Sequence, residues 1–242
     1  MSEFKLPTET VELPSKGLLY PEDSELAKGT VEMKYMTAKE EDILTNQNYI
    51  KNGTVLDKLM RSLIVSKINY DELLIGDKNA IMVAARILGY GSEYTFEYGG
   101  EEHTVDLTTL EDKPLKEGLF VNRTNEFDFT LPKSQNTITF KLLSHKDEQD
   151  IARELEGLKK INKDSSPELS TRLKYMILSV NGERDKKVIR DFVENYLLAQ
   201  DSRALREYIR EIQPDVDLTF FPDGSSDRVN LPIGLKFFWP DI

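Results

Sequence analysis

The chain has 242 residues, 31% of them charged and 39% hydrophobic, and a formal net charge of −11 at pH 7. This composition is typical of a globular protein. Without an apolar run of eighteen residues we expect no membrane span, and the acidic balance argues against nucleic-acid binding because it repels phosphates. The absence of cysteine excludes disulfides, thiol catalysis and cysteine zinc sites. The first residues lack the pattern of a signal peptide, so we expect a cytoplasmic protein.

Residues 1–30 are predicted to form an extended N-terminal arm. Pro7, Pro14 and Pro21 each remove a backbone donor and disfavour helix in the residue before them. An arm that packs on nothing of its own chain would suit partner binding. A disordered terminus is the alternative that the sequence leaves open.

A strand at 31–36 is predicted to run into a helix at about 38–49. Thr37 and Glu40 have the spacing of a capping box, in which each side chain bonds the other residue's backbone amide. Gly53 follows at a favourable position for a helix end.

A second helix is predicted at about 54–68, because its apolar residues have the three-and-four spacing of one buried face. Asp77 stands where the N-cap of a third helix is expected. Arg86 lies two and a half turns further on, and we expect it to tie this helix to a hairpin at 94–107.

The same order of features recurs after residue 128, which predicts an internal duplication. The matching features are Leu-Pro-Ser-Lys at 13–16 and Leu-Pro-Lys-Ser at 131–134, strands at 31–37 and 138–144, capping residues Thr37 with Glu40 and Ser144 with Asp147, Asp77 with Arg86 and Asp201 with Arg210, and hairpins at 94–107 and 218–231. Lys34 and Lys141 are 107 residues apart, whereas Asp77 and Asp201 are 124 apart, so the second copy carries insertions. A helix that opens with Ser166 and Pro167 is expected within it.

These features predict an α+β fold, predominantly helical, with duplication of a strand, helices and hairpin unit. The predicted division is 1–30 extended N-terminal arm, 31–107 first repeat domain, 108–128 linker, 129–231 second repeat domain and 232–242 aromatic C-terminal tail.

The sequence gives little support for chemistry. His103 and His145 are the only histidines, both expected at the surface, and a metal site would need them brought together from different copies. Glycine-rich phosphate motifs and serine-nucleophile elbows are absent. The basic stretches 159–163 and 184–187 are interpreted as solvated helix ends. We therefore expect no catalytic, cofactor-binding or metal-binding residue and no enzymatic activity; an enzyme would need carboxylates that converge in a cleft between the copies.

Residues 11–21 and 31–44 resemble the baseplate proteins of T-even-type (T4-like) contractile-tailed bacteriophages, a family that includes a baseplate hub subunit and a related hub assembly catalyst. The resemblance implies a non-enzymatic protein that binds other phage baseplate or tail proteins in the host cytoplasm during assembly and either stays in the virion or leaves. The alternative is a soluble tail-assembly chaperone that is absent from the mature virion.

Apolar residues at the two ends of the chain are predicted to contact partners, because an exposed aromatic tail would otherwise form an adhesive patch. These residues are Leu13, Pro14, Leu18, Leu19, Tyr20, Phe237, Phe238 and Trp239. Folding of the tail back into the core is the alternative for its aromatic residues.

Overall fold

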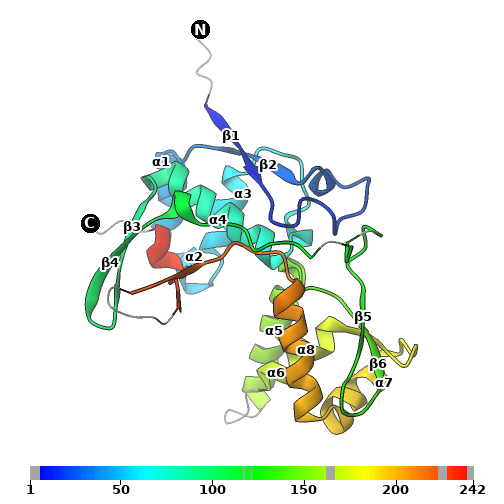
Figure 1. The fold of residues 1–242 in the computed structure, drawn as a ribbon. Coiled ribbons are helices and arrows are strands. Elements are labelled where there is room, and N and C mark those ends of the chain that lie inside the picture. The colour runs from blue at the N-terminus through cyan, green and yellow to red at the C-terminus, as the bar shows by residue number, and fades with distance from the viewer. Residues whose placement is uncertain (1–5, 117, 121, 162–166, 223–227, 239–242) are drawn as a thin grey trace.

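The computed structural model describes residues 6–116, 118–120, 122–161, 167–222 and 228–238 and shows an α+β fold (Figure 1). Among these residues, no helix is long and apolar enough to cross a membrane. Ser166 and Trp239 lie outside the described ranges, as do parts of the basic stretch 159–163 and of the predicted hairpin at 218–231.

The described strands form small antiparallel sheets, namely the pairs β1–β2, β3–β4 and β8–β9 and the three-stranded β5–β6–β7. The strands are β1 (Thr8–Glu12), β2 (Thr30–Lys34), β3 (Glu93–Tyr98), β4 (Glu101–Asp106), β5 (Phe127–Thr130), β6 (Thr137–Phe140), β7 (Ile177–Val180), β8 (Thr219–Phe220) and β9 (Val229–Asn230). The α-helices are α1 (Ala38–Leu44), α2 (Gln47–Lys51), α3 (Val55–Leu63), α4 (Ile75–Tyr90), α5 (His145–Ile161), α6 (Glu168–Met176), α7 (Lys186–Asp191) and α8 (Ala199–Ile212). The shorter helical segments are η1 (Glu25–Lys28), η2 (Tyr70–Glu72), η3 (Leu107–Thr109), the π-helical η4 (Phe192–Tyr196) and η5 (Leu235–Phe238).

The elements gather into two lobes (Figure 1). The first lobe contains α1–α4 and β1–β4, and the second contains α5–α8 and β5–β7. After α8 the chain returns to the first lobe, where β8, β9 and η5 lie beside the β3–β4 hairpin (Figure 1). Phe220 of β8 packs edge-on against Phe96 of β3 with ring centroids 4.9 Å apart. The second predicted hairpin therefore packs on the first.

The predicted step from strand to capped helix is confirmed in both lobes. Glu40 accepts hydrogen bonds from the backbone amide and hydroxyl of Thr37 at 3.1 and 2.6 Å, which completes the capping box at the start of α1. Asp147 accepts the equivalent bonds from Ser144 at 3.0 and 2.9 Å at the start of α5. Local sequence is sufficient here because each cap involves residues only three apart.

Two predicted helices are shorter than expected. The helix predicted at 38–49 breaks after Leu44, because Asn46 caps a new helix by accepting from the amides of Asn48 and Tyr49. The helix predicted at 54–68 ends at Leu63, because Ile64 pairs with Met33 of β2 in an antiparallel bridge. The early end of the second helix is caused by a tertiary contact, which the spacing of apolar residues along a helix cannot predict.

The described N-terminal residues do not form an arm that packs on nothing. β1 pairs with β2 along its length, from Thr8 opposite Lys34 to Glu12 opposite Thr30. Leu13, Leu19 and Tyr20 are at most 3% exposed and belong to the main hydrophobic core. Each proline stands in or beside a turn or at a strand end, where the missing amide leaves no ladder bond unmade. Both the unpacked arm and the disordered terminus are thus wrong for residues 6–30.

The predicted linker at 108–128 pairs with the segment that follows α8. Lys113 donates its amide to the carbonyl of Asp215 at 2.8 Å, and Asp217 donates to that of Glu111 at 2.8 Å. Phe120 is buried. The two connections between the lobes therefore run side by side and hydrogen-bond to each other.

A close backbone contact holds the segment after α8 against α4. Gly76 lies in the first turn of α4, and a β-carbon there would lie 1.8 Å from the carbonyl oxygen of Pro214. We expect Gly76→Ala to lower the free energy of unfolding by about 3 kcal/mol, because the clash is with backbone and can be relieved only by moving a chain segment. The measurement is urea unfolding followed by circular dichroism.

Gly157→Ala is the matched control, because Gly157 lies in α5 and a β-carbon added there would have no heavy atom within 4 Å. It should raise stability by roughly 0.5 to 1 kcal/mol through helix propensity. Equal effects of the two substitutions would contradict the close-packing explanation.

Candidate functional site

A buried carboxylate ties the N-terminal loop to α4. Asp77 is fully buried at the third position of the helix and accepts from the amide and the hydroxyl of Ser15 at 2.9 and 2.7 Å. The hydroxyl of Tyr20 donates to the same carboxylate at 2.5 Å. Burial raises the pKa of Asp77, although the bonds from Tyr20 and Ser15 oppose this effect. Residues about sixty positions apart in sequence are thereby joined.

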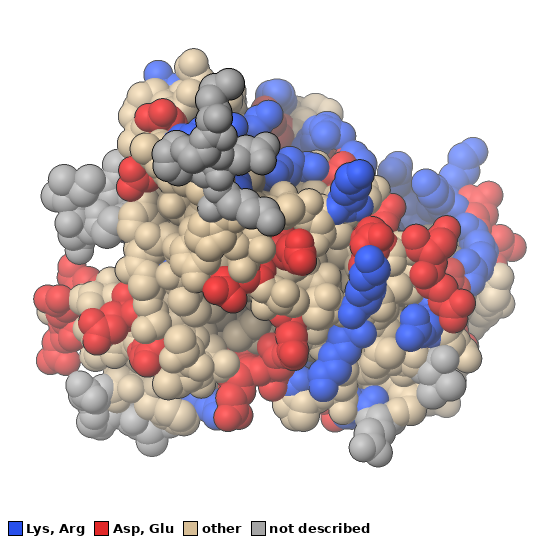
Figure 2. All heavy atoms as spheres, turned by 90° about the horizontal axis from the view of Figure 1, so that it is seen from above, with Lys and Arg blue, Asp and Glu red and all other residues tan. Residues whose placement is uncertain are grey.

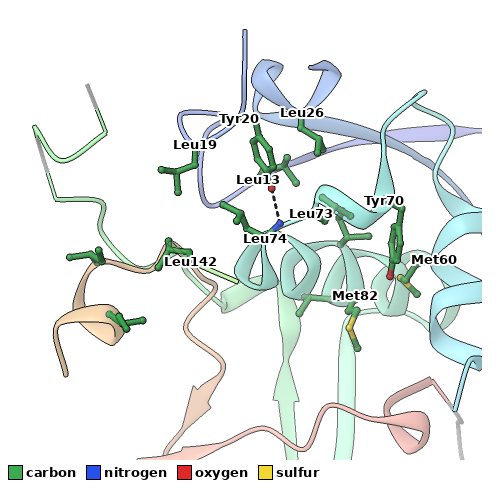
Figure 3. Packing of buried hydrophobic residues seen from close by; sticks show 14 of the residues in the cluster. Leu13, Leu19, Tyr20, Leu26, Met60, Tyr70, Leu73, Leu74, Met82 and Leu142 are labelled. Carbon is green, nitrogen blue, oxygen red and sulfur yellow. Dashed lines mark hydrogen bonds between the residues drawn. The ribbon is translucent and has the colours of Figure 1, made fainter. Parts of the chain in front are cut away.

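Tyr20 extends this network to the beginning of the helix. Its hydroxyl accepts from the amide of Leu74 at 2.9 Å, the bond drawn in Figure 3. Burial, together with the Asp77 carboxylate, raises the pKa of Tyr20, so the hydroxyl remains protonated and continues to donate. Figure 3 shows Leu13, Tyr20 and Leu74 side by side above α4. The hydrogen bonds are therefore enclosed by apolar side chains, which strengthens them.

The second lobe contains the corresponding contact. Asp201 is fully buried at the third position of α8 and accepts from the amides of Lys133 and Ser134 at 2.7 and 3.0 Å. Its pKa is lowered: burial acts to raise it, but the bonds from Lys133 and Ser134 outweigh that effect. The two matched aspartates thus have pKa values shifted in opposite directions.

The prediction that Asp77 and Asp201 are N-caps is wrong. The N-cap positions belong to Leu74 and Leu198, and each aspartate lies three residues further into its helix. Each accepts hydrogen bonds from a distant loop and none of these bonds comes from its own first turn. The sequence did hold a signal for this pairing, since the Leu-Pro loop and the aspartate recur together in the same order.

A second contact also recurs in both lobes. Lys34 of β2 donates to Glu40 at 2.8 Å, and Lys141, 107 residues later, donates to Asp147 at 2.7 Å. Burial alone would raise the pKa of Glu40, but the bonds from Lys34, Thr37 and Ser62 lower it to about 2. In each lobe, therefore, the carboxylate in the first turn of the helix pairs with a lysine at, or directly after, the end of the preceding strand.

The lobes meet at a pair of backbone hydrogen bonds. The amide of His145 donates to the carbonyl of Leu73 at 2.7 Å, and the amide of Ile75 donates to that of Leu143 at 3.3 Å. The start of α5 is thus held against the start of α4.

A polar cluster lies beneath this contact. The Nδ1 and Nε2 atoms of His145 lie 3.1 Å from Lys78 Nζ and 3.2 Å from an Asp57 oxygen, and Nε2 is 3.0 Å from the side chain of Gln149. Tyr70 packs edge-on against the imidazole at 4.7 Å. Burial alone would raise the pKa of Asp57, but the contact with His145 and the charge of Lys78 hold it well below its usual range.

The cluster joins the lobes and is poorly suited to catalysis. His145 is only 3% exposed, so the expectation of a surface histidine is wrong, and His103 is buried as well. Both ring nitrogens of His145 already have partners within hydrogen-bond distance, which leaves no ring position for a substrate. Within the described residues, no group of three or more histidine, aspartate or glutamate side chains could hold a metal ion.

Arg86 fulfils its predicted role, whereas Arg210 does not. The Arg86 guanidinium donates to the carbonyls of Gly91 and Glu93 at 2.9 and 3.0 Å and so fixes α4 to β3. Arg210 is exposed. The second predicted hairpin lies beside the first lobe, so Arg210 has no hairpin directly behind its helix (Figure 1).

Most of the residues predicted to contact partners are buried within the chain. Leu13, Leu19, Tyr20, Phe237 and Phe238 are at most 3% exposed. Pro14 is buried and Leu18 is partly buried, whereas Trp239 is not described. The ring of Phe237 packs edge-on against that of Tyr94 at 4.8 Å, so these tail residues close the core of the first lobe. Partner contact through them remains a prediction.

Two of these residues nevertheless reach a surface hollow at the junction of the lobes. The hollow has a volume of about 600 Å³ and is lined by Leu19, Tyr20, Pro21, Asn69, Asp71, Glu72, Leu74, Asn125, Lys141, Ser144, Lys146 and Asp147. Its walls come from both lobes and combine apolar, amide and charged groups. A protein segment bound here would contact both lobes at once, which makes the hollow the candidate site for a partner.

Comparison of the chain with protein-family models, curated proteins and solved structures gave no match.

The opposite pKa shifts of the two matched aspartates give a test by pH. Because the pKa of Asp77 is raised, its contribution to folding stability is largest at a pH below the ordinary aspartate pKa and decreases as pH rises. Because the pKa of Asp201 is lowered, its contribution to stability is present at a pH above the ordinary aspartate pKa and is lost as pH falls. Between about pH 7 and pH 3, the stability lost in Asp77→Asn should therefore grow, and that lost in Asp201→Asn should shrink. Urea unfolding of both variants and the unsubstituted chain at each pH measures this, and parallel slopes would contradict it.

The contribution of the junction cluster can be tested at Asp57. We expect Asp57→Asn to lower the free energy of unfolding by about 2 kcal/mol at neutral pH, because Lys78 and His145 lose a charged partner in a largely buried site. The pKa of Asp57 is lowered in the folded chain, so this difference should diminish as pH falls below the ordinary pKa of an aspartate, where the unfolded chain takes up a proton and the native carboxylate resists it.

Asp42→Asn serves as the control, since Asp42 is exposed on α1. It should change stability by less than about 0.5 kcal/mol. Unfolding monitored by circular dichroism at several pH values gives both quantities, and an Asp57 effect no larger than the control would refute the role of the cluster.

Proposed function

We propose that this protein is a non-enzymatic component of a contractile phage tail baseplate, either a subunit of the hub or a factor that assembles it, and that it bridges other baseplate proteins. The observation that carries the proposal is the structural role of the residues that resemble the baseplate family. Residues 13–20 form the loop whose Ser15 and Tyr20 bind Asp77, and residues 34–40 form the ion pair and cap of α1. The residues that resemble the baseplate family are thus those that organise the first lobe.

We further propose that the lobes derive from one duplicated unit. Three contacts support this: the loop amides on Asp77 and Asp201, the strand-to-cap ion pairs of Lys34 and Lys141, and a strand bridge. In the bridge, Met33 pairs with Ile64 directly after α3, and Phe140 pairs with Ile177 directly after α6. Met33 and Phe140 have the same 107-residue separation as Lys34 and Lys141.

A duplicated scaffold suits a bridging role. Each lobe presents a similar framework with different surface residues, and the hollow between the lobes is built from both. A partner bound there would be sensitive to the relative position of the lobes. The tail-assembly chaperone is the alternative function, and it differs in whether the protein remains in the finished particle.

The proposal is tested by quantitative mass spectrometry of virions of a phage that encodes this chain, beside lysate of infected cells. A fixed low copy number relative to known tail proteins is expected for a hub subunit. Abundance in lysate with absence from particles would indicate an assembly factor or chaperone. Baseplates that form normally in a phage lacking the coding sequence would overturn all three roles.

A further inference from the structure

The second lobe differs in charge from the rest of this acidic protein. Residues 129–212 contain 16 Lys and Arg against 14 Asp and Glu, whereas the rest of the chain contains 16 against 29. Figure 2 shows acidic side chains at the left, the side on which Figure 1 places β3 and β4, and most basic side chains toward the right. The molecule is therefore strongly acidic at one end and close to neutral at the other, where basic and acidic side chains are mixed.

The second lobe includes a groove beside α7. It has a volume of about 600 Å³, an apolar wall that includes Ile177 and Ile189, and charged side chains along its rim from α5, α6 and α7. Its cations Lys141, Lys174 and Arg184 are neutralised by ion pairs with Asp147, Glu154 and Glu126, respectively.

The cations of α7 itself are different. Lys186, Lys187 and Arg190 are exposed and, in the part of the chain that the structure describes, form no ion pair. The nearby acids are already engaged, because Asp191 accepts from Asn195 and Glu194 pairs with Lys174. Lys186 and Arg190 line the groove, so its rim offers positive charge that is not neutralised within the described residues.

The acidic end holds the complementary feature. From Gly91 to Asp112 the chain has seven acids and no Lys or Arg. In the β3–β4 hairpin Glu97 lies opposite Glu102, and Glu93 lies opposite Asp106. Like charges directly opposite each other destabilise a strand pair. These four acids are exposed and lie on the outer face of the hairpin, while Tyr94 and Phe96 face the core.

The spacing of the acidic side chains on the hairpin is similar to that of the basic side chains on α7. Side chains directly opposite in an antiparallel pair have β-carbons about 5 Å apart, and helical residues four apart are about 6 Å apart. Glu97 with Glu102 therefore matches Lys186 with Arg190.

We propose that the groove beside α7 binds the outer face of the β3–β4 hairpin of a second copy of this chain. The two surfaces lie at opposite ends of one molecule, so the contact is head-to-tail and can add further copies in a row or ring. Association relieves the like-charge pairs of the hairpin and supplies anionic partners for the cations of α7. This inference does not depend on the baseplate proposal.

Sedimentation velocity of the full chain tests the inference. At about 10 mM salt, where charges are felt over about 30 Å, the protein should form dimers and larger species that dissociate at about 300 mM salt. Lys186→Glu with Arg190→Glu should weaken association roughly tenfold or more, and Glu97→Lys with Glu102→Lys should do the same. A chain that remains monomeric at low salt overturns the proposal.

Mixing the two double variants is the decisive experiment. The native hairpin of one variant can bind the native groove of the other, and the two altered surfaces are again opposite in charge. The mixture should associate where each variant alone does not. Matched controls are Lys159→Glu with Lys160→Glu and Glu22→Lys with Asp23→Lys, which change the net charge equally at other exposed sites. If these controls weaken association as much, or if mixing restores nothing, net charge alone is responsible and the proposed interface is wrong.

Discussion

The structure depends on a carboxylate placed at the third residue of a helix and bound by a distant loop. A buried carboxylate is stable only when its oxygens accept hydrogen bonds, and Asp77 receives them from Ser15 and Tyr20 rather than from its own helix. The loop after β1 and the start of α4 must therefore fold together. Because Leu74 and Ile75 also bind Tyr20 and the second lobe, one helix start fixes the N-terminal segment and the junction of the lobes at once.

The return of the chain after α8 makes the lobes interdependent. Residues 215 and 217 pair with 111–113, Pro214 lies against Gly76, and the rings of Phe237 and Phe238 complete the core of the first lobe. The first lobe therefore cannot complete its core until the second has been synthesised. A bridging function fits this architecture, because the hollow at the junction is shaped by both lobes and by the segment that carries the baseplate resemblance.

Charge is distributed according to the same division. The first lobe and the returning segment hold most of the excess acid, and the β3–β4 hairpin places like charges opposite each other within a stretch that contains no Lys or Arg. The second lobe is close to neutral overall, yet among its described residues the cations of α7 form no ion pair. The like charges that face each other destabilise the strand pair, and the uneven distribution of charge orients any charged partner that approaches.

Features that depend on neighbouring residues can be predicted from the amino-acid sequence. The caps at Thr37 and Ser144, the β3–β4 hairpin and the order of strand and helix follow from residues a few positions apart, and Arg86 was placed correctly because its hairpin directly follows its helix. Tertiary structure alone decided the role of Asp77 and Asp201, the early end of α3 at Ile64 and the burial of His145, because their partners lie tens of residues away. The burial of both chain ends was decided in the same way: composition shows that Leu13 and Phe237 are apolar, but only the folded chain shows which surface covers them.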